Sequence, residues 1–323
     1  YESRTRARDQ LRTRTPDMTT QQVHQQYTLL AGKSTGGETS KNVKNMEACG
    51  FTAAQLEGLP DDAIMGISCG NPVPHCGLKE GATYVDLGCG TGTDVFLAAR
   101  ITGATGKSIG LDYVAEMCAR AEECGKKVVP ALPAGSYEFD HADCNGGYLK
   151  KYADASIDAV SGNCCIHFLD RKTVVPEILR ILKPGGKFVF AEVCRKQCLP
   201  PDDLYKLMNE AFEKDIVCTA NTVGGKMFRS FVSISQTYAM DAQIVMDEMK
   251  ALGFVDVDFV QRLPVPGTVE FPNQECPPFI NSKTGESNPE VEEWVSRFKS
   301  VFEKYNVNDY VSFDCCSGTK PAQ

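Results

Sequence analysis

Three cysteines stand in loops or at the ends of predicted elements. Cys69 lies in the segment Ser68-Cys69-Gly70-Asn71-Pro72, Cys164 follows Asn163 at the end of a predicted strand, and Cys218 follows a predicted helix. Thiolates are the preferred ligands of soft ions, and three of them suit a soft, three-coordinate ion. The three positions therefore predict a three-thiolate site if the fold brings them together. The alternative for each is the role of a small, buried apolar residue.

A glycine-rich turn follows an apolar run and precedes a helical segment. Val85-Asp86-Leu87 leads into Gly88-Cys89-Gly90-Thr91-Gly92. Glycines let the backbone approach a ligand closely, and a dinucleotide-binding loop is one interpretation of this pattern. The carboxylate of Asp86 favours a methyl donor instead, because it can hold the cationic amino end of a methionine and would repel a pyrophosphate.

Two further acids end the next predicted strands. Asp112 closes the second strand about twenty residues after Gly92, where an acid accepts hydrogen bonds from ribose hydroxyls in Rossmann-type sites. Asp143 ends the third strand, where it can accept from an adenine amino group. Ligands bind at the carboxyl edge of such sheets, so three acids at consecutive strand ends predict one nucleoside site.

Apolar runs of strand length alternate with helical segments around these residues. This alternation predicts an α/β fold with a mostly parallel sheet. The predicted strands are 83–87, 108–111, 137–141, 157–161 and 187–192, with later candidates at 255–260 and 309–313. The predicted helices are 94–101, 113–124, 173–182, 202–217 and 242–252, with a turn at 183–186 and a Pro- and Gly-rich loop over 264–289.

These elements predict three regions. Residues 1–48 form a polar, partly disordered N-terminal arm, residues 49–200 form the cofactor-binding domain, and residues 201–323 form an insertion and a small C-terminal substrate-binding extension.

Over about residues 83–193 the chain resembles the class I S-adenosylmethionine methyltransferases. The resemblance rests on the glycine-rich turn, on the three acids and on Leu182-Lys183-Pro184-Gly185-Gly186. It implies a Rossmann-like, seven-stranded fold with S-adenosylmethionine as cofactor. The implied cofactor-binding residues are Asp86, Gly88, Cys89, Gly90, Thr91, Gly92, Asp112, Tyr113, Met117, Asp143, Cys144 and Asn163.

Within that superfamily the cysteine positions resemble the arsenite methyltransferases. The matching positions are Cys69-Gly70-Asn71-Pro72, Asn163-Cys164, Cys218 ahead of Gly224-Gly225, and Cys49. The chain differs from the family at Ile67-Ser68 and Val217 and in a longer gap after Cys218. These differences concern the methyl acceptor rather than the methyl transfer.

The resemblance implies that Cys69, Cys164 and Cys218 bind trivalent arsenic and that Cys49, on a mobile arm, is a redox partner. Arsenic held by thiolates keeps a lone pair that can attack the sulfonium methyl group in line, so catalysis is mainly positioning. The implied substrate is arsenite or its thiol conjugate, and the implied co-substrate is a thiol reductant, either glutathione or a thioredoxin-type protein.

Two other function classes stay open. One is a methyltransferase for an organic thiol, amine or phenol, in which His167, His141 or Glu192 would act as the base. The other is a cofactor-binding protein without turnover whose cysteines collect a metalloid. Arsenite-dependent consumption of the methyl donor distinguishes all three.

Composition narrows the choice of partners. A formal net charge of −8 argues against a nucleic-acid or anionic-membrane partner, because both require clustered Lys and Arg. No apolar run approaches the length of a membrane span, about 20 residues. We therefore expect a cytoplasmic location. An organelle transit peptide is the alternative for the Arg-rich segment before Met18.

Overall fold

The computed structural model describes residues 27–28, 39–196, 206–207, 210–211, 214, 216–218, 240–264, 279–281, 283–302, 309 and 311–322. The chain forms two compact units. The sheet unit comprises 18–192, 242–263 and 313–323, and the second unit comprises 1–17, 193–241 and 264–312. These units differ from the predicted regions, because strands from late in the sequence return to the first sheet.

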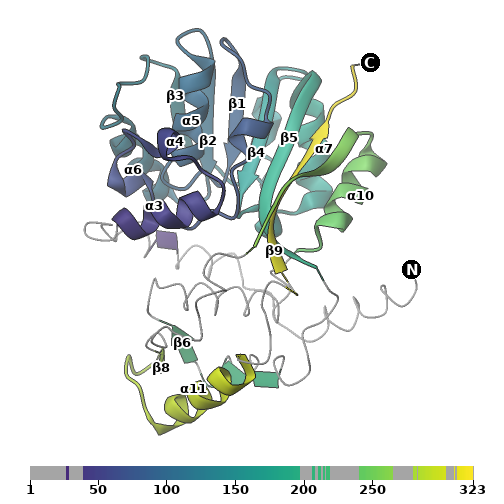
Figure 1. Ribbon diagram of the computed structural model, residues 1–323. Coiled ribbons are helices and arrows are strands. Elements are labelled where there is room, and N and C mark those ends of the chain that lie inside the picture. The colour runs from purple at the N-terminus through teal and green to yellow at the C-terminus, as the bar shows by residue number, and fades with distance from the viewer. Residues whose placement is uncertain are drawn as a thin grey trace. The chain divides into compact units, whose positions relative to one another are not determined.

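A seven-stranded sheet organises the sheet unit (Figure 1). The strand order is β3-β2-β1-β4-β5-β9-β7, in which β1 to β5 pair in parallel and β7 runs antiparallel to β9. The strands are β1 (Thr83–Leu87), β2 (Lys107–Asp112), β3 (Tyr137–His141), β4 (Ile157–Asn163), β5 (Leu182–Arg195), β7 (Val255–Leu263) and β9 (Val311–Thr319). The predicted Rossmann-like fold with a mostly parallel, seven-stranded sheet is confirmed.

The central strands are buried on both faces because helices cross between them. In β1, Tyr84, Val85 and Leu87 have no exposed surface. Helix α5 (Thr93–Thr102) packs on β1 and β2, and α6 (Ala115–Gly125) packs on β2 and β3. Helix α7 (Arg171–Ile181) lies between β4 and β5 in the chain, and α10 (Ala242–Leu252) packs beside β7. The parallel strands β1 to β5 therefore direct their carboxyl ends to one edge of the sheet.

The segment before β1 is more ordered than predicted. Helix α3 (Thr39–Ala48) and the short α4 (Ala53–Leu56) belong to the sheet unit, and Thr52 and Gln55 form a capping box at the start of α4. Three-residue 3-10 turns follow as η1 (Asp61–Ala63) and η2 (Val73–His75), with η3 (Tyr148–Lys151) and η4 (Ile166–Phe168) further along. Residues 39–48 of the arm predicted over 1–48 are thus helical, and most of its remainder lies outside the described residues.

Three local predictions in the C-terminal half are wrong. The helix predicted over 202–217 does not reach its end, because β6 (Ile216–Cys218) pairs antiparallel with β8 (Phe279–Asn281). Strand β8 also interrupts the predicted loop over 264–289, and α11 (Pro289–Phe302) begins at its last residue. The turn predicted at 183–186 lies within β5, although Gly185 keeps the positive φ of a turn residue, at 78°.

Trp294 anchors the core of the second unit. Its side chain is fully buried, its indole stacks on Phe298 with ring centroids 5.1 Å apart, and its Nε1 donates to the carbonyl of Leu207 at 2.9 Å. Long-range packing therefore joins α11 to residues more than eighty positions earlier in the chain.

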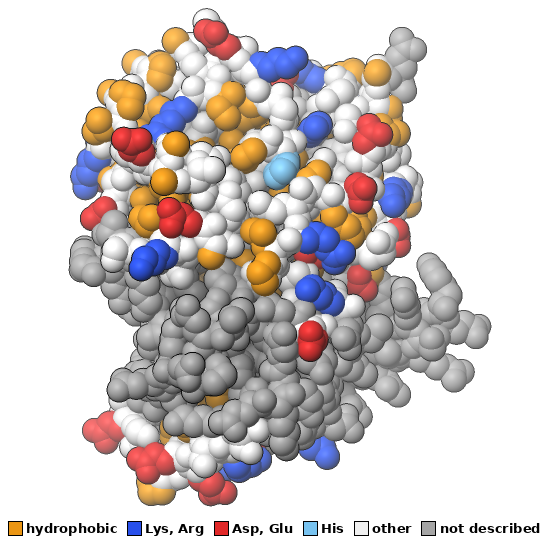
Figure 2. All heavy atoms as spheres, viewed as in Figure 1, with side chains coloured by type: hydrophobic (Ala, Val, Ile, Leu, Met, Phe, Trp, Pro, Cys, Tyr) orange, Lys and Arg blue, Asp and Glu red, His pale blue; other side chains and the backbone are white. Residues whose placement is uncertain are grey.

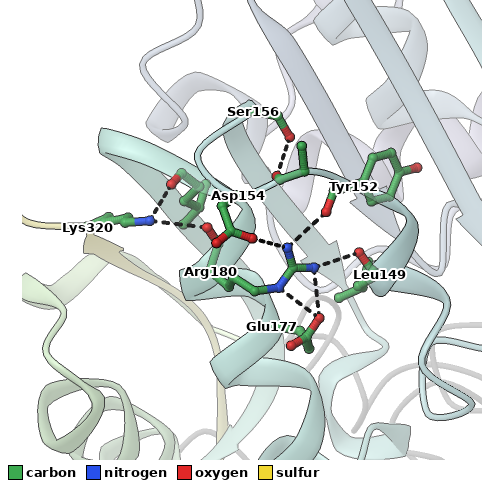
Figure 3. Close-up of polar contacts among 9 residues, drawn as sticks. Leu149, Tyr152, Asp154, Ser156, Glu177, Arg180 and Lys320 are labelled. Carbon is green, nitrogen blue, oxygen red and sulfur yellow. Dashed lines mark hydrogen bonds and ion pairs between the residues drawn. The ribbon is translucent and has the colours of Figure 1, made fainter.

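Arg180 of α7 ties the η3 region to that helix (Figure 3). Its guanidinium donates to the carbonyls of Leu149 and Tyr152 at 3.2 and 2.9 Å. It also forms ion pairs with Asp154 and Glu177 at 2.6 and 2.9 Å. A planar fork that satisfies two carbonyls and two carboxylates at once fixes the orientation of this loop.

The last described segment of the chain is held beside the end of α7 and the start of β5. Lys320 Nζ donates to the carbonyls of Arg180 and Leu182 at 3.2 and 2.7 Å, as Figure 3 shows. The backbone of Lys320 exchanges hydrogen bonds with Gly185 and Gly186. The end of β9 is therefore fastened to the start of β5.

We expect Arg180→Ala to lower the free energy of unfolding by about 2 kcal/mol, because it leaves loop carbonyls and carboxylates without their donors. Urea denaturation followed by circular dichroism measures the change. Lys126→Ala is the control, because Lys126 pairs with Glu123 on an open surface and its loss should not be measurable. Equal stability of Arg180→Ala and the parent chain would contradict this role.

Candidate active site

The glycine-rich turn lies at the carboxyl edge of β1, where Gly88, Gly90 and Gly92 all have positive φ. Gly88 cannot carry a side chain, because a Cβ there would lie 2.6 Å from the Cβ of Cys165. The Cys165 thiol in turn donates to the carbonyl of Leu87 at 2.9 Å. The turn is therefore packed against Cys165 at Gly88. At Gly90 a Cβ would meet nothing within 4 Å, so the backbone there is open to a ligand.

Asp112 holds this turn from the end of β2. One carboxylate oxygen accepts from the backbone N–H of Gly90 at 2.8 Å, and the other accepts from Val114 at 2.9 Å. Burial raises the pKa of Asp112 above its ordinary value, and these two backbone donors oppose the shift. Asp112 thus joins the ends of β1 and β2, which pair in parallel.

Asp86 is buried within β1. Its carboxylate accepts from Ser161 Oγ at 2.8 Å, and the Ser161 hydroxyl also bonds the hydroxyl of Tyr84 at 2.5 Å. Burial raises the pKa of Asp86 well above its ordinary value, and the charge of Asp94 raises it further. One carboxylate oxygen of Asp86 is therefore engaged inside the sheet.

The other predicted cofactor residues differ in exposure. Tyr113 and Asp143 are exposed at the ends of β2 and β3. Cys89 and Cys144 are buried, and burial raises the pKa of the Cys144 thiol to about 12. Met117 has no exposed surface.

Thr91 fastens the preceding segment to the turn. Its Oγ1 donates to the carbonyl of Ala63 at 3.0 Å, and the same carbonyl accepts from Thr93 Oγ1 at 2.6 Å. The Thr91 side chain therefore serves the packing of η1 over the glycine-rich turn.

Cys69 and Cys164 are joined by a disulfide, with their Cα atoms 5.7 Å apart. Cys164 directly follows β4 with φ of 58°, and its N–H donates to the carbonyl of Ala191 at 2.8 Å. Two of the three predicted ligand positions are thus brought together, although they are 95 residues apart in the chain.

Asn163 clamps the Cys69 loop to the end of β4. Its Oδ1 accepts from the N–H of Cys69 at 3.0 Å, and its Nδ2 donates to the carbonyl of Gly70 at 3.0 Å. The same Nδ2 donates to Asp94 Oδ2 at 3.0 Å. The contacts of Asn163 therefore concern the cysteine loop, whereas the sequence predicted a cofactor contact.

Asp94 belongs to this cluster but was not among the predicted site residues. It is the second residue of α5 and is 5% exposed. An acid in the first turn of a helix is ordinary, because it complements the helix dipole, so nothing in the sequence distinguishes it. Burial raises its pKa to about 6, and the hydrogen bond from Asn163 opposes the shift.

The sequence predicted that Cys49 lies on a mobile arm, but the structure places it in a packed segment. It follows α3 directly, is buried, and donates from its Sγ to the carbonyl of Ser68 at 3.0 Å. Ser68 precedes Cys69, so Cys49 lies beside the loop that carries the predicted arsenic ligand. The reason for the error is that the polar residues of α3 include Asn42 and Asn45, which are buried and hide the helix's inner face.

Cys218 ends β6 of the second unit, and its side chain lies outside the described residues. In the part of the chain that is described, no group of three His, Cys, Asp or Glu side chains is arranged to hold a metal ion. The convergence of Cys218 with Cys69 and Cys164 stays a prediction.

His167 and Glu192 form a pair near the carboxyl ends of β4 and β5, in which Glu192 is buried and His167 is partly exposed. His167 Nδ1 lies 2.9 Å from Glu192 Oε2, and Glu192 Oε1 accepts from the N–H of Ile166 at 2.6 Å. Glu192 is 1% exposed. The pair is an oriented imidazole next to the candidate site, a geometry that can support proton transfer.

Acidic and basic side chains are interspersed on the face in Figure 2, with no continuous basic area among the residues coloured there. Among the helices of the described residues, none has both the length and the apolarity that crossing a bilayer requires.

Comparison with known proteins identifies relatives. An arsenite methyltransferase of Halobacterium salinarum is 30% identical over 205 residues, 58% of this chain and 51% of that protein. An arsenite methyltransferase of Aquipseudomonas alcaligenes is 28% identical over 192 residues, 58% of this chain and 52% of that protein. A demethylmenaquinone methyltransferase of Lactococcus lactis is 27% identical over 190 residues, 57% of this chain and 69% of that protein.

The chain thus spans about half the length of the two arsenite methyltransferases that it matches, and its resemblance to them is confirmed. The family model described as "Methyltransferase domain" matches residues 78–250. Because this match covers more than half of the 323 residues, the chain belongs to the methyltransferase domain family.

Proposed function

We propose that this chain transfers methyl groups from S-adenosylmethionine to trivalent arsenic held by the thiolates of Cys69, Cys164 and Cys218. The observation that carries the proposal is the Cys69–Cys164 disulfide, which brings two sulfurs into bonding reach at the carboxyl edge of the sheet. Asn163 holds the same loops together through two further hydrogen bonds. Two relatives that are named arsenite methyltransferase support arsenic as the methyl acceptor.

The residues at the glycine-rich turn fit the cofactor. Gly88 lets the backbone approach a ligand, and Asp112 presents a carboxylate at the end of β2, where a ribose would lie. Asp143 follows β3 and is exposed, so it can accept from an adenine amino group. When bound, the cofactor supplies a methyl group made electrophilic by its sulfonium sulfur.

The chain's own residues then act mainly by positioning. Three thiolates leave trivalent arsenic with a lone pair, which forms the As–C bond while the electrons of the breaking C–S bond pass to the cofactor's sulfur. No general base is needed in that step. Binding of arsenite by thiols releases their protons together with its hydroxide groups as water.

The disulfide fits the electron balance of repeated turnover. Methyl transfer leaves arsenic formally pentavalent, and two thiolates return it to the trivalent state by giving up two electrons and forming one disulfide. Cys69 and Cys164 would be one such pair, and Cys49, whose thiol donates to the carbonyl of Ser68, would exchange with Cys69. Two equivalents of an external thiol, from glutathione or a thioredoxin-type protein, would restore both protein thiols.

The test is incubation of the reduced chain with S-adenosylmethionine, arsenite and glutathione. We expect S-adenosylhomocysteine and methylated arsenic to appear in equal amounts, and turnover to stop after about one cycle without glutathione. Both products are measured by liquid chromatography coupled to elemental mass spectrometry. Arsenite binding without S-adenosylhomocysteine would favour a metalloid-collecting protein and would contradict the proposal.

The His167–Glu192 pair supports one alternative, a methyltransferase for an organic acceptor that must lose a proton. Glu192 would orient the imidazole and stabilise its charged form. In that case His167→Gln would remove activity toward the organic acceptor, whereas the arsenic reaction should tolerate the change. A panel of thiols, amines and phenols tested in parallel with arsenite distinguishes the two.

A further inference from the structure

One carboxylate oxygen at the site has no partner. Asp94 Oδ2 accepts from Asn163, but Asp94 Oδ1 is fully buried and accepts no hydrogen bond from any described residue. A buried acceptor without a donor costs about 1–3 kcal/mol, and more when it is charged. Such an atom points to a donor that the chain itself does not provide.

The unpartnered oxygen and the charges around Asp94 favour a cationic donor. The groups that interact with Asp94 are Asp86 of β1, Tyr84 of the same strand, Cys76 at the end of η2 and Cys315 of β9. All four are neutral or negative, and no lysine or arginine acts on either carboxylate in the described residues. Two buried acids side by side need a positive group or a shared proton.

The cofactor brings such a group to this edge of the sheet. The methionine end of S-adenosylmethionine carries an ammonium group, and the glycine-rich turn that precedes α5 ends two residues before Asp94. We propose that Asp94 Oδ1 accepts a hydrogen bond from the cofactor's ammonium group. This inference rests on the proposed function, because it needs S-adenosylmethionine as the ligand.

This assignment differs from the one made from the sequence, in which Asp86 holds the amino end. Asp86 already accepts a hydrogen bond from Ser161 and lies within β1, so we assign the direct contact with the ammonium group to Asp94. Asp94 also reaches Asn163, which holds Cys69 and Gly70. One side chain therefore contacts both the methyl donor and the clamp of the cysteine loop.

Asp94→Asn is the matched variant. Its amide oxygen can still accept from Asn163, while its NH₂ replaces the unpartnered oxygen and removes the charge. We expect the Kd for S-adenosylmethionine to rise by about 30-fold or more. The Kd for 5′-methylthioadenosine, which lacks the amino-acid portion, should change by less than about threefold. Isothermal titration of the reduced full chain measures both.

Two controls make the outcomes distinct. Asp112→Asn should weaken both ligands, because both contain the ribose. The wild-type chain is also titrated with S-adenosylhomocysteine and its deaminated analogue, and we expect the deaminated form to bind at least about 30-fold more weakly. The second comparison needs no variant, so it can overturn the inference even if Asp94→Asn does not fold.

Equal affinity of the parent chain and Asp94→Asn for S-adenosylmethionine would overturn the inference and leave the proposed function intact. Equal affinity of the wild-type chain for the two homocysteine analogues would do the same. A folded wild-type chain that binds none of these nucleosides would instead remove the proposed function.

Discussion

Serine at position 164 is expected to lower arsenite methylation by at least about a hundredfold and to leave the Kd for S-adenosylmethionine within about threefold. A hydroxyl is a hard ligand that stays protonated at neutral pH, so it cannot replace a thiolate on a soft ion. Cys69→Ser should behave in the same way, because the sulfurs of Cys69 and Cys164 lie side by side and are joined in the disulfide. Initial rates at saturating cofactor measure the first effect, and titration measures the second.

Cys124→Ala is the matched control. Cys124 is also buried in the sheet unit, but it lies on α6 and is not one of the predicted arsenic ligands. Its loss should leave both quantities unchanged apart from a modest loss of stability. If Cys164→Ser keeps its rate, or if Cys165→Ser loses as much as Cys164→Ser, the ligand assignment is wrong.

Asp112→Ala is expected to weaken S-adenosylmethionine binding by at least about a hundredfold, the second large effect. The change removes the acceptor that we propose for the ribose hydroxyls and also releases the N–H groups of Gly90 and Val114. A less ordered turn then presents its backbone poorly to the ligand. Isothermal titration gives the affinity, and thermal unfolding without ligand shows whether the chain stays folded.

Asp140→Asn serves as the comparison for this variant. Asp140 lies on the neighbouring strand β3 and forms an ion pair with Lys151 away from the turn, so its neutralisation should not change cofactor affinity. A folded Asp112→Ala chain that binds S-adenosylmethionine as tightly as the parent would exclude Asp112 from the cofactor site.

The parts of the fold that the sequence predicted correctly depend on local patterns. Strands β1 and β3 and helix α10 match the predicted bounds residue for residue, because each is an apolar period bounded by Gly, Asp or Ser. Where the pairing partner lies far away, prediction failed. The segment Ile216–Cys218 becomes a strand because Phe279–Asn281 pairs with it, and no local signal carries that information.

The candidate site divides in the same way. The sequence predicted that Asp112 and the glycine-rich turn share one edge of the sheet, because each residue type has a specific use at its position, and the hydrogen bond from Gly90 to Asp112 agrees with that placement. Asp94 was missed because its value depends on burial and on a neighbour 69 residues away, Asn163. Cys49 was misplaced because polar residues on the buried face of α3 resemble an exposed segment.

The disulfide between Cys69 and Cys164 closes a covalent ring around four of the seven strands, β1 to β4. Closing a loop of this size restricts the unfolded chain and favours the folded state by about 4–5 kcal/mol. The oxidised chain is thus the form that resists heat and proteases, and in that form neither sulfur can act as a ligand. In a reducing compartment the chain therefore gains two thiol ligands and loses the stability that the disulfide provides. The lifetime of the chain in a cell then depends on how often its thiols are regenerated.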